Sequence, residues 1–145
     1  MTQPLYNTQI LRLAASIPHH QRLASPMASI EKRSPVCGSR VAVDVDLDAE
    51  GRVVALGMQV RACALGQASA SLMGAHAIGR TAAELDMTRA ALTNWLAGEC
   101  DTPPDWPGLD LFTPALPHSA RHPSIRLAFE AVAEAAALAL REKAA

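Results

Sequence analysis

Two cysteines, Cys37 and Cys63, stand on either side of a segment that the sequence predicts to be a β-hairpin. Residues 40–47 alternate strictly between two faces, which is typical of a half-buried strand, and residues 53–60 form a second predicted strand. Gly51 closes the intervening turn, where a residue that tolerates a positive φ is needed. A hairpin brings its two ends together, so the two thiols are expected side by side at its open end. Such a pair is a disulfide, a metal site or a chance arrangement.

Cys63 has the stronger chemical setting of the two. It is predicted at the first turn of a helix that runs to about Ala77, where backbone N–H groups and the helix dipole favour a thiolate. A thiolate is the form that binds zinc or iron, or that accepts persulfide sulfur. The third cysteine, Cys100, falls in a Pro-rich loop beside two acids, which favours a solvent-facing thiol over a ligand. An odd number of cysteines also argues against a disulfide framework.

His122 is the histidine with the clearest potential as a metal ligand. It directly precedes Pro123 and Ser124, which are start signals for the last helix. A neutral imidazole is a natural partner for two thiolates in a zinc or iron–sulfur site. A histidine held by a neighbouring carbonyl is an equally good interpretation. The adjacent pair His19 and His20 points to different faces of any regular element, which favours a solvated helix end.

The order of the predicted elements indicates an α+β fold. The predicted helices cover residues 7–23, 63–77, 81–98 and 123–142, and residues 23–35 form a loop or a short edge strand. We therefore expect a small antiparallel sheet of two or three strands, packed on one face by helices, in a single domain over residues 1–145.

Composition narrows the range of functions. Thirteen basic and fourteen acidic residues give a net charge of −1, which provides no global attraction for nucleic acid or an anionic membrane. No apolar run approaches the ~20 residues of a membrane span, and no secretion signal is evident at the start. A location in the cytoplasm, where thiols stay reduced, is therefore expected. The sequence has no Walker-type or GxGxxG pattern for a nucleotide.

The motif around the cysteines resembles that of a known family. Pro35-Val36-Cys37-Gly38 before a strand, then a hairpin, then Cys63 with Ala68-Ser69-Ala70-Ser71 in a helix, is similar to the U-type iron–sulfur cluster scaffolds. This family comprises the NifU N-terminal domain, IscU and SufU, and the helix opening looks closest to the SufU-like branch. The resemblance extends from the first helix to Glu142. It implies the fold of that family for the whole domain.

The resemblance also implies a function. A protein of this kind takes sulfur from a cysteine desulfurase, assembles a 2Fe–2S cluster or holds a zinc ion, and passes clusters to acceptor apoproteins, without being an enzyme in the usual sense. Cys37 and Cys63 would be ligands. The aspartate that follows Cys-Gly in the family is Ser39 here, and the third family cysteine falls on His122 or Pro123. His122 is thus the candidate third ligand, and Ser39 would be a weak one.

A second hypothesis belongs to a different class of protein. The chain is then a degenerate family member that keeps the fold and acts as an interaction or regulatory protein without a metal. The Cys37-Gly38-Ser39 start and the absence of a cysteine near residue 122 favour this alternative. Metal content of the purified protein distinguishes the two.

Overall fold

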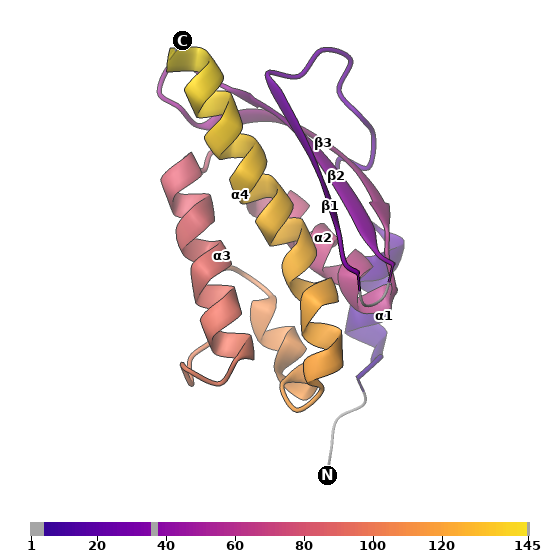
Figure 1. Ribbon diagram of the computed structural model, residues 1–145. Coiled ribbons are helices and arrows are strands. Elements are labelled where there is room, and N and C mark those ends of the chain that lie inside the picture. The colour runs from indigo at the N-terminus through magenta and orange to yellow at the C-terminus, as the bar shows by residue number, and fades with distance from the viewer. Residues whose placement is uncertain (1–4, 36–37, 145) are drawn as a thin grey trace.

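The computed structural model describes residues 5–35 and 38–144 as a three-stranded antiparallel sheet with helices over one face (Figure 1). The strands follow one another in the order β1-β2-β3. The strands are β1 Ala28–Arg33, β2 Arg40–Leu47 and β3 Val53–Arg61. The α-helices are α1 Thr8–Ala15, α2 Ala64–His76, α3 Ala82–Leu96 and α4 His122–Ala144, and two 3-10 helices, η1 Leu109–Ala115 and η2 Ser119–Arg121, precede α4. The predicted α+β architecture, with its small antiparallel sheet packed on one face by helices, is confirmed.

One face of the sheet points to the helices and forms the core. Lys32 of β1 lies opposite Val41 in the register and reaches Glu134 of α4 at 2.7 Å, which identifies this face. Val43 and Val45 of β2 share it and are fully buried. α4 packs along β1 and β2, as Figure 1 shows.

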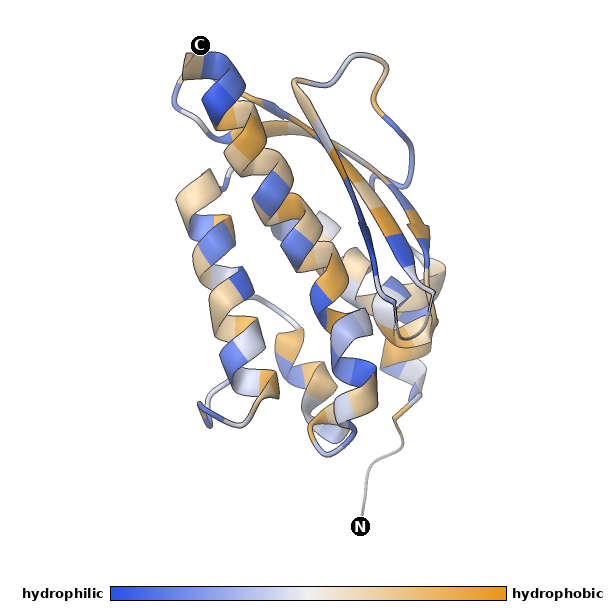
Figure 2. Ribbon diagram, viewed as in Figure 1, coloured by the Kyte–Doolittle hydropathy of each residue, from blue (hydrophilic) through white to orange (hydrophobic). Residues whose placement is uncertain are grey.

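The long helix α4 approaches the sheet closely because its inner side is built from small residues. Figure 2 shows hydrophobic and hydrophilic bands alternating along this helix, as expected for a helix that packs on one side. The buried alanines of α4 are Ala128, Ala131, Ala133, Ala135, Ala136 and Ala139. Within the described ranges, no helix has the length and apolar character needed to cross a membrane.

The other face of the sheet is crossed by residues 18–27, which connect α1 to β1 and are called the crossing segment here. The carbonyl of His19 accepts a hydrogen bond from the backbone N–H of Met58 on β3, at 3.0 Å. The backbone N–H of Leu23 then donates to the carboxylate of Asp44 on β2, also at 3.0 Å. The segment therefore runs from the β3 edge across the sheet to the β1 edge.

Asp44 is the polar centre of this covered face. Its side chain accepts hydrogen bonds from the guanidinium of Arg22, at 2.7 and 2.9 Å, and from the hydroxyl of Ser29. Burial alone raises the pKa of Asp44, but these hydrogen bonds and that from Leu23 outweigh it and hold the pKa below its usual value. The residue is 0% exposed, so β2, which was predicted to be a half-buried strand, is buried on both faces at this position.

The first helix is shorter than predicted because the chain leaves it to enter the crossing segment. It ends at Ala15, whereas the sequence pattern extended it to residue 23. Pro18 disfavours helical backbone at the residue before it and cannot itself donate a helical hydrogen bond. The chain is thereby released from the helix in time to form the crossing segment.

Candidate functional site

The end of the sheet where β2 begins and β3 finishes is where α2 and α4 also begin. A Cβ atom built on Gly66, in the first turn of α2, would lie 2.7 Å from the Cβ of Ala62 and 3.3 Å from the carbonyl oxygen of Ser124. Only glycine fits such a close approach without a shift of its neighbours. The first turns of α2 and α4 are therefore in direct contact beside the open end of the hairpin. We call this region the hairpin end.

A buried hydrogen bond fixes the two helices at the hairpin end. The hydroxyl of Ser69 on α2 donates to the carbonyl oxygen of Ile125 on α4, at 2.5 Å. Both residues are fully buried. The relative position of the two helix starts is thus set by packing and by a specific polar contact.

Cys63 is the N-cap residue of α2, one position before the predicted first turn. It is partly buried, and its side chain makes no capping hydrogen bond. Residues 64–66 at a helix start have no intrahelical acceptors for their N–H groups. Together with the helix dipole, these groups place partial positive charge next to the Cys63 Sγ.

The loop between β1 and β2 carries the other predicted cysteine. The Ser34 backbone N–H donates to the carbonyl of Ser39 at 2.9 Å, and the Gly38 N–H donates back to the carbonyl of Ser34 at 3.0 Å. These two bonds join Ser34, after β1, to Gly38 and Ser39, before β2. Cys37 itself lies outside the described residues, so the predicted pairing of Cys37 with Cys63 stays a prediction.

Two serines next to this loop are buried at the hairpin end. Ser34 and Ser39 are each 3% exposed, and Ser34 follows Lys32 by two residues, so its side chain points to the helix-covered face. Ser39, predicted as a weak ligand, has a polar interaction of its own. The hydroxyl of Ser34, in contrast, has no hydrogen-bond partner among residues 5–35 and 38–144.

Ser34 is a residue that sequence reasoning missed. The signal for it was its place directly before Pro35, at the start of the loop that carries Cys37. Nothing in the sequence showed that its side chain would be buried, because burial depends on contacts between segments that are distant in sequence. A buried hydroxyl without a partner is unusual and indicates an unfilled hydrogen-bonding capacity at this position.

His122 is the first residue of α4 and is 6% exposed. Its Nε2 lies 2.9 Å from the carbonyl oxygen of Ala115 in η1. A carbonyl oxygen only accepts hydrogen bonds, so Nε2 carries the proton and Nδ1 is the nitrogen left to coordinate a metal. The interpretation of this histidine as one held by a neighbouring carbonyl is therefore what the structure shows, and ligation through Nδ1 stays a prediction.

The described residues do not form a metal site on their own. Among residues 5–35 and 38–144, no three side chains of His, Cys, Asp or Glu come together in a way that could hold a metal ion. A site with three protein ligands at the hairpin end would therefore depend on Cys37. Cys100 is exposed on the loop after α3, in agreement with its prediction as a solvent-facing thiol. Its Sγ lies 3.4 Å from the carbonyl oxygen of Thr102.

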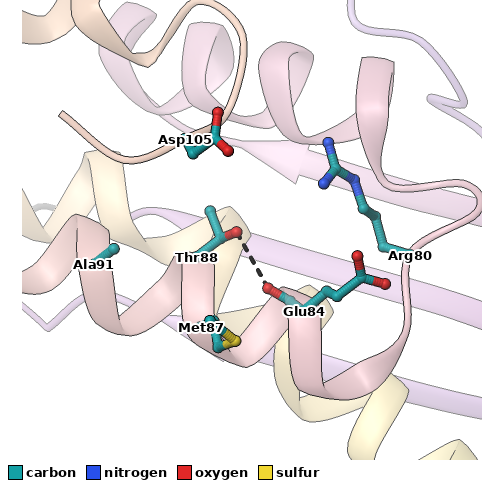
Figure 3. A pocket seen from close by; sticks show the side chains of 6 residues that line it. All are labelled: Arg80, Glu84, Met87, Thr88, Ala91 and Asp105. Atoms are coloured by element: carbon teal, nitrogen blue, oxygen red, sulfur yellow. Dashed lines mark hydrogen bonds between the residues drawn. The ribbon is translucent and has the colours of Figure 1, made fainter.

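A separate pocket of about 230 Å³ lies between α3 and the segments that carry Arg80 and Asp105 (Figure 3). Three of its polar lining residues, Arg80, Glu84 and Thr88, make contacts in the local structure. Glu84 accepts the backbone N–H of Thr81 in the capping box of α3, and Thr88 donates to the carbonyl of Glu84 at 3.2 Å. The guanidinium of Arg80 lies 4.7 Å from the ring centre of Trp106. These contacts explain the pocket as a packing feature around the start of α3.

Comparison with known proteins gave matches among solved structures. A search with protein-family models found no match, and no curated protein matched. The crystal structure of a nitrogen-fixing NifU-like protein (N-terminal) from Brucella abortus is similar with a TM-score of 0.87 and 36% sequence identity, over 94% of this chain and 95% of that chain.

Two more distant structures share the fold. A putative iron–sulfur cluster assembly scaffold protein for the SUF system from Fervidobacterium islandicum AW-1 is similar with a TM-score of 0.80 at 18% identity, over 91% of this chain and 96% of that chain. A hypothetical protein matches with a TM-score of 0.73 at 20% identity, over 89% of this chain and 94% of that chain. At these identities the likeness concerns the fold alone.

Proposed function

This chain belongs to the family of NifU-like N-terminal domains, and from that premise we propose that it is a scaffold for iron–sulfur cluster assembly. The observation that carries the proposal is the 36% identity over 94% of the chain, on a backbone that superimposes with a TM-score of 0.87. The cargo is iron with sulfide, as a 2Fe–2S cluster, or zinc. The protein takes sulfur from a cysteine desulfurase, passes clusters to acceptor apoproteins and works in the cytoplasm, and it is not an enzyme.

The proposed ligands are Cys37, Cys63 and His122, with Ser39 in the position of the family's aspartate. Cys63 is supported by its place at the start of α2, where backbone N–H groups and the helix dipole present partial positive charge to its sulfur. His122 is supported by the Nε2 hydrogen bond to Ala115, which leaves Nδ1 as the candidate donor atom, and by the contact between the first turns of α2 and α4. A tetrahedral site then takes its fourth ligand from water or from a partner protein.

The hydrogen-bonding character of the hairpin end supports an anionic cargo. The Ser34 hydroxyl has no partner among the described residues, and the N–H groups at the start of α2 have no intrahelical acceptor. Thiolate and sulfide sulfur are hydrogen-bond acceptors. Bound sulfur would therefore offer an acceptor to donors that have none among residues 5–35 and 38–144.

The alternative is a degenerate member of the same family that binds partners without carrying a metal. The observation that favours it is the engagement of His122 with the Ala115 carbonyl, which gives this histidine a structural role independent of any metal. In this case the fold is retained and cluster assembly is lost.

Metal and sulfide content of anaerobically purified protein tests the proposal. The variants are Cys37→Ser, Cys63→Ser and His122→Gln, because the glutamine side chain keeps an N–H donor for Ala115 but has no imidazole Nδ1. Cys100→Ser is the matched control. We expect stoichiometric iron with sulfide, or zinc, in wild type and in Cys100→Ser, and loss of it in the two thiol variants. Wild-type protein without metal, under conditions that load other scaffolds of the family, would favour the degenerate member.

A further inference from the structure

Three arginines lie side by side across the sheet at the hairpin end, on the face away from the helices. Arg33 of β1 pairs with Arg40 of β2, and Arg40 pairs with Arg61 of β3. Directly opposite residues in a sheet point to the same face, and Lys32 on the next position of β1 points to the helices. The three guanidinium groups, called the arginine row here, therefore share the outer face.

The arginine row is poorly neutralised within the chain. Glu31 lies 3.9 Å from Arg33 and 3.9 Å from Arg40, and these distant contacts are the ion pairs of the row within residues 5–35 and 38–144. The side chains of Arg33 and Arg40 are 64% and 45% exposed. Like charges directly opposite each other destabilise a sheet. The row thus costs stability without a matching gain inside the fold, and a net charge of −1 for the whole chain makes this basic patch a local feature.

A hollow lies next to the arginine row on the same face. It has a volume of about 160 Å³ and is lined by Glu31, Arg40, Ala42, Gln59 and Arg61. Ala42 lies between Glu31 and Gln59 in the register, and its side chain is a single methyl group, which leaves space between these two neighbours. Farther along β2, the crossing segment covers this face at Asp44, so the open part of the face is confined to the hairpin end.

The arginine row also adjoins the cysteine-bearing segments. Arg40 directly follows Ser39, and Arg61 precedes Cys63 by two residues. A protein held on the row would thus lie against the end of the sheet that carries the candidate site. We infer that the arginine row is a docking surface for a partner protein, which it recognises through an acidic segment whose carboxylates bind the guanidinium groups.

Charge and geometry favour an acidic protein segment over a nucleic acid. The row spans two strand spacings, about 10 Å, which matches a few carboxylates better than an extended phosphate backbone. The three strands contain no Phe, Trp or Tyr on which a base could stack. Arginine binds carboxylates through two parallel hydrogen bonds, so a short acidic segment suffices to fill the row. The inference goes beyond the proposed scaffold function, because it holds whether or not the thiols carry metal.

The test is an NMR titration of the whole ¹⁵N-labelled chain with a short synthetic peptide of alternating Glu and Ala. The same peptide with Gln for Glu is the uncharged control, and a short oligouridylate represents nucleic acid. We expect the Glu peptide to shift the amide signals of residues 31–33, 40–42 and 59–61, more strongly at ~0.01 M than at ~0.15 M ionic strength. Shifts centred elsewhere, or tighter binding of the oligouridylate, would overturn the inference.

Two variants separate a docking role from a structural one. Arg40→Gln removes the middle guanidinium of the row, and Arg141→Gln removes an exposed arginine near the end of α4 with the same change in net charge. We expect Arg40→Gln to weaken peptide binding about two- to fivefold and to leave the melting temperature equal or higher. We expect Arg141→Gln to bind the peptide as wild type does. Equal weakening by both variants, or a clear loss of stability in Arg40→Gln, would refute docking at the row. Because peptide binding is measured without reference to metal content, a failure of the docking inference can be distinguished from a failure of the scaffold proposal.

Discussion

Replacing Ser34 by alanine is expected to stabilise this protein, although the residue is buried at the candidate site. The Ser34 side chain is 3% exposed, and its hydroxyl has no hydrogen-bond partner among the described residues. Burial of an unsatisfied hydroxyl costs about 1–3 kcal/mol, because the hydrogen bonds to water are lost without replacement. Alanine removes the hydroxyl and keeps the Cβ, so no cavity larger than one oxygen atom is created.

The lower end of this range is the safer expectation, because part of the cost can be relieved by a bound water. We therefore expect the free energy of unfolding of Ser34→Ala to rise by about 1 kcal/mol, which raises the melting temperature by about 2–4 °C in a domain of this size. Thermal unfolding of metal-free protein, followed by circular dichroism, measures the shift directly.

Ser69→Ala is the matched control for this prediction. Ser69 is equally buried, but its hydroxyl donates to the carbonyl oxygen of Ile125 at 2.5 Å. Its loss is expected to lower the free energy of unfolding by about 1 kcal/mol, with the opposite sign to Ser34→Ala. If Ser34→Ala is destabilised to the same degree as Ser69→Ala, the Ser34 hydroxyl has a partner in solution and the reasoning fails.

Three further predictions concern single contacts. Because the folded-state pKa of Asp44 is lowered, the stability that this residue contributes is present above the unfolded pKa of about 3.9 and is lost as pH falls through the folded value. Urea unfolding should therefore show an acid-induced loss of stability that is smaller in Asp44→Asn than in wild type. At neutral pH this variant is itself destabilised by about 2 kcal/mol. Melting curves should show His122→Ala less stable than His122→Gln by about 1 kcal/mol, since only glutamine can donate to Ala115, and equal curves would exclude this hydrogen bond. Gly66→Ala should lose about 1–3 kcal/mol in denaturant unfolding, because its Cβ would overlap Ala62, and wild-type stability would contradict the close contact.

The local features of this fold were accessible from the sequence. The alternation in residues 40–47 predicted β2 with its observed bounds, and the predicted start of a helix at residue 81 coincides with the N-cap of α3, where Thr81 and Glu84 form a complete capping box. Both depend on residues close in sequence. The family resemblance, based on the motif around Cys37 and Cys63, is confirmed by the 36% identical NifU-like structure.

The features that sequence reasoning missed are those created by distant contacts. β2 was predicted to be half-buried, and its burial at Asp44 was not foreseen, because nothing within the strand indicates that residues 18–27 return across it. Trp106 likewise gave no signal, yet its indole N–H donates to the Leu72 carbonyl at 2.9 Å and its ring meets Phe129 edge-on. The burial of Ser34 was likewise not foreseen from the sequence.

The electrostatic character of the hairpin end bears on how it would bind a metal. The described groups there are mainly hydrogen-bond donors or cations, namely the N–H groups at the start of α2, the Ser34 hydroxyl and the arginine row. Such surroundings stabilise anionic sulfur and disfavour an isolated metal cation, and Ser39 supplies no negative charge to offset them. In the proposed site, the thiolates of Cys37 and Cys63 would supply the charge that attracts a metal, whereas an imidazole ligand from His122 would contribute a bond but no charge. Loss of either thiol should therefore reduce metal content more than His122→Gln does, and the reverse order would mean that the imidazole, not the pair of thiolates, governs the site.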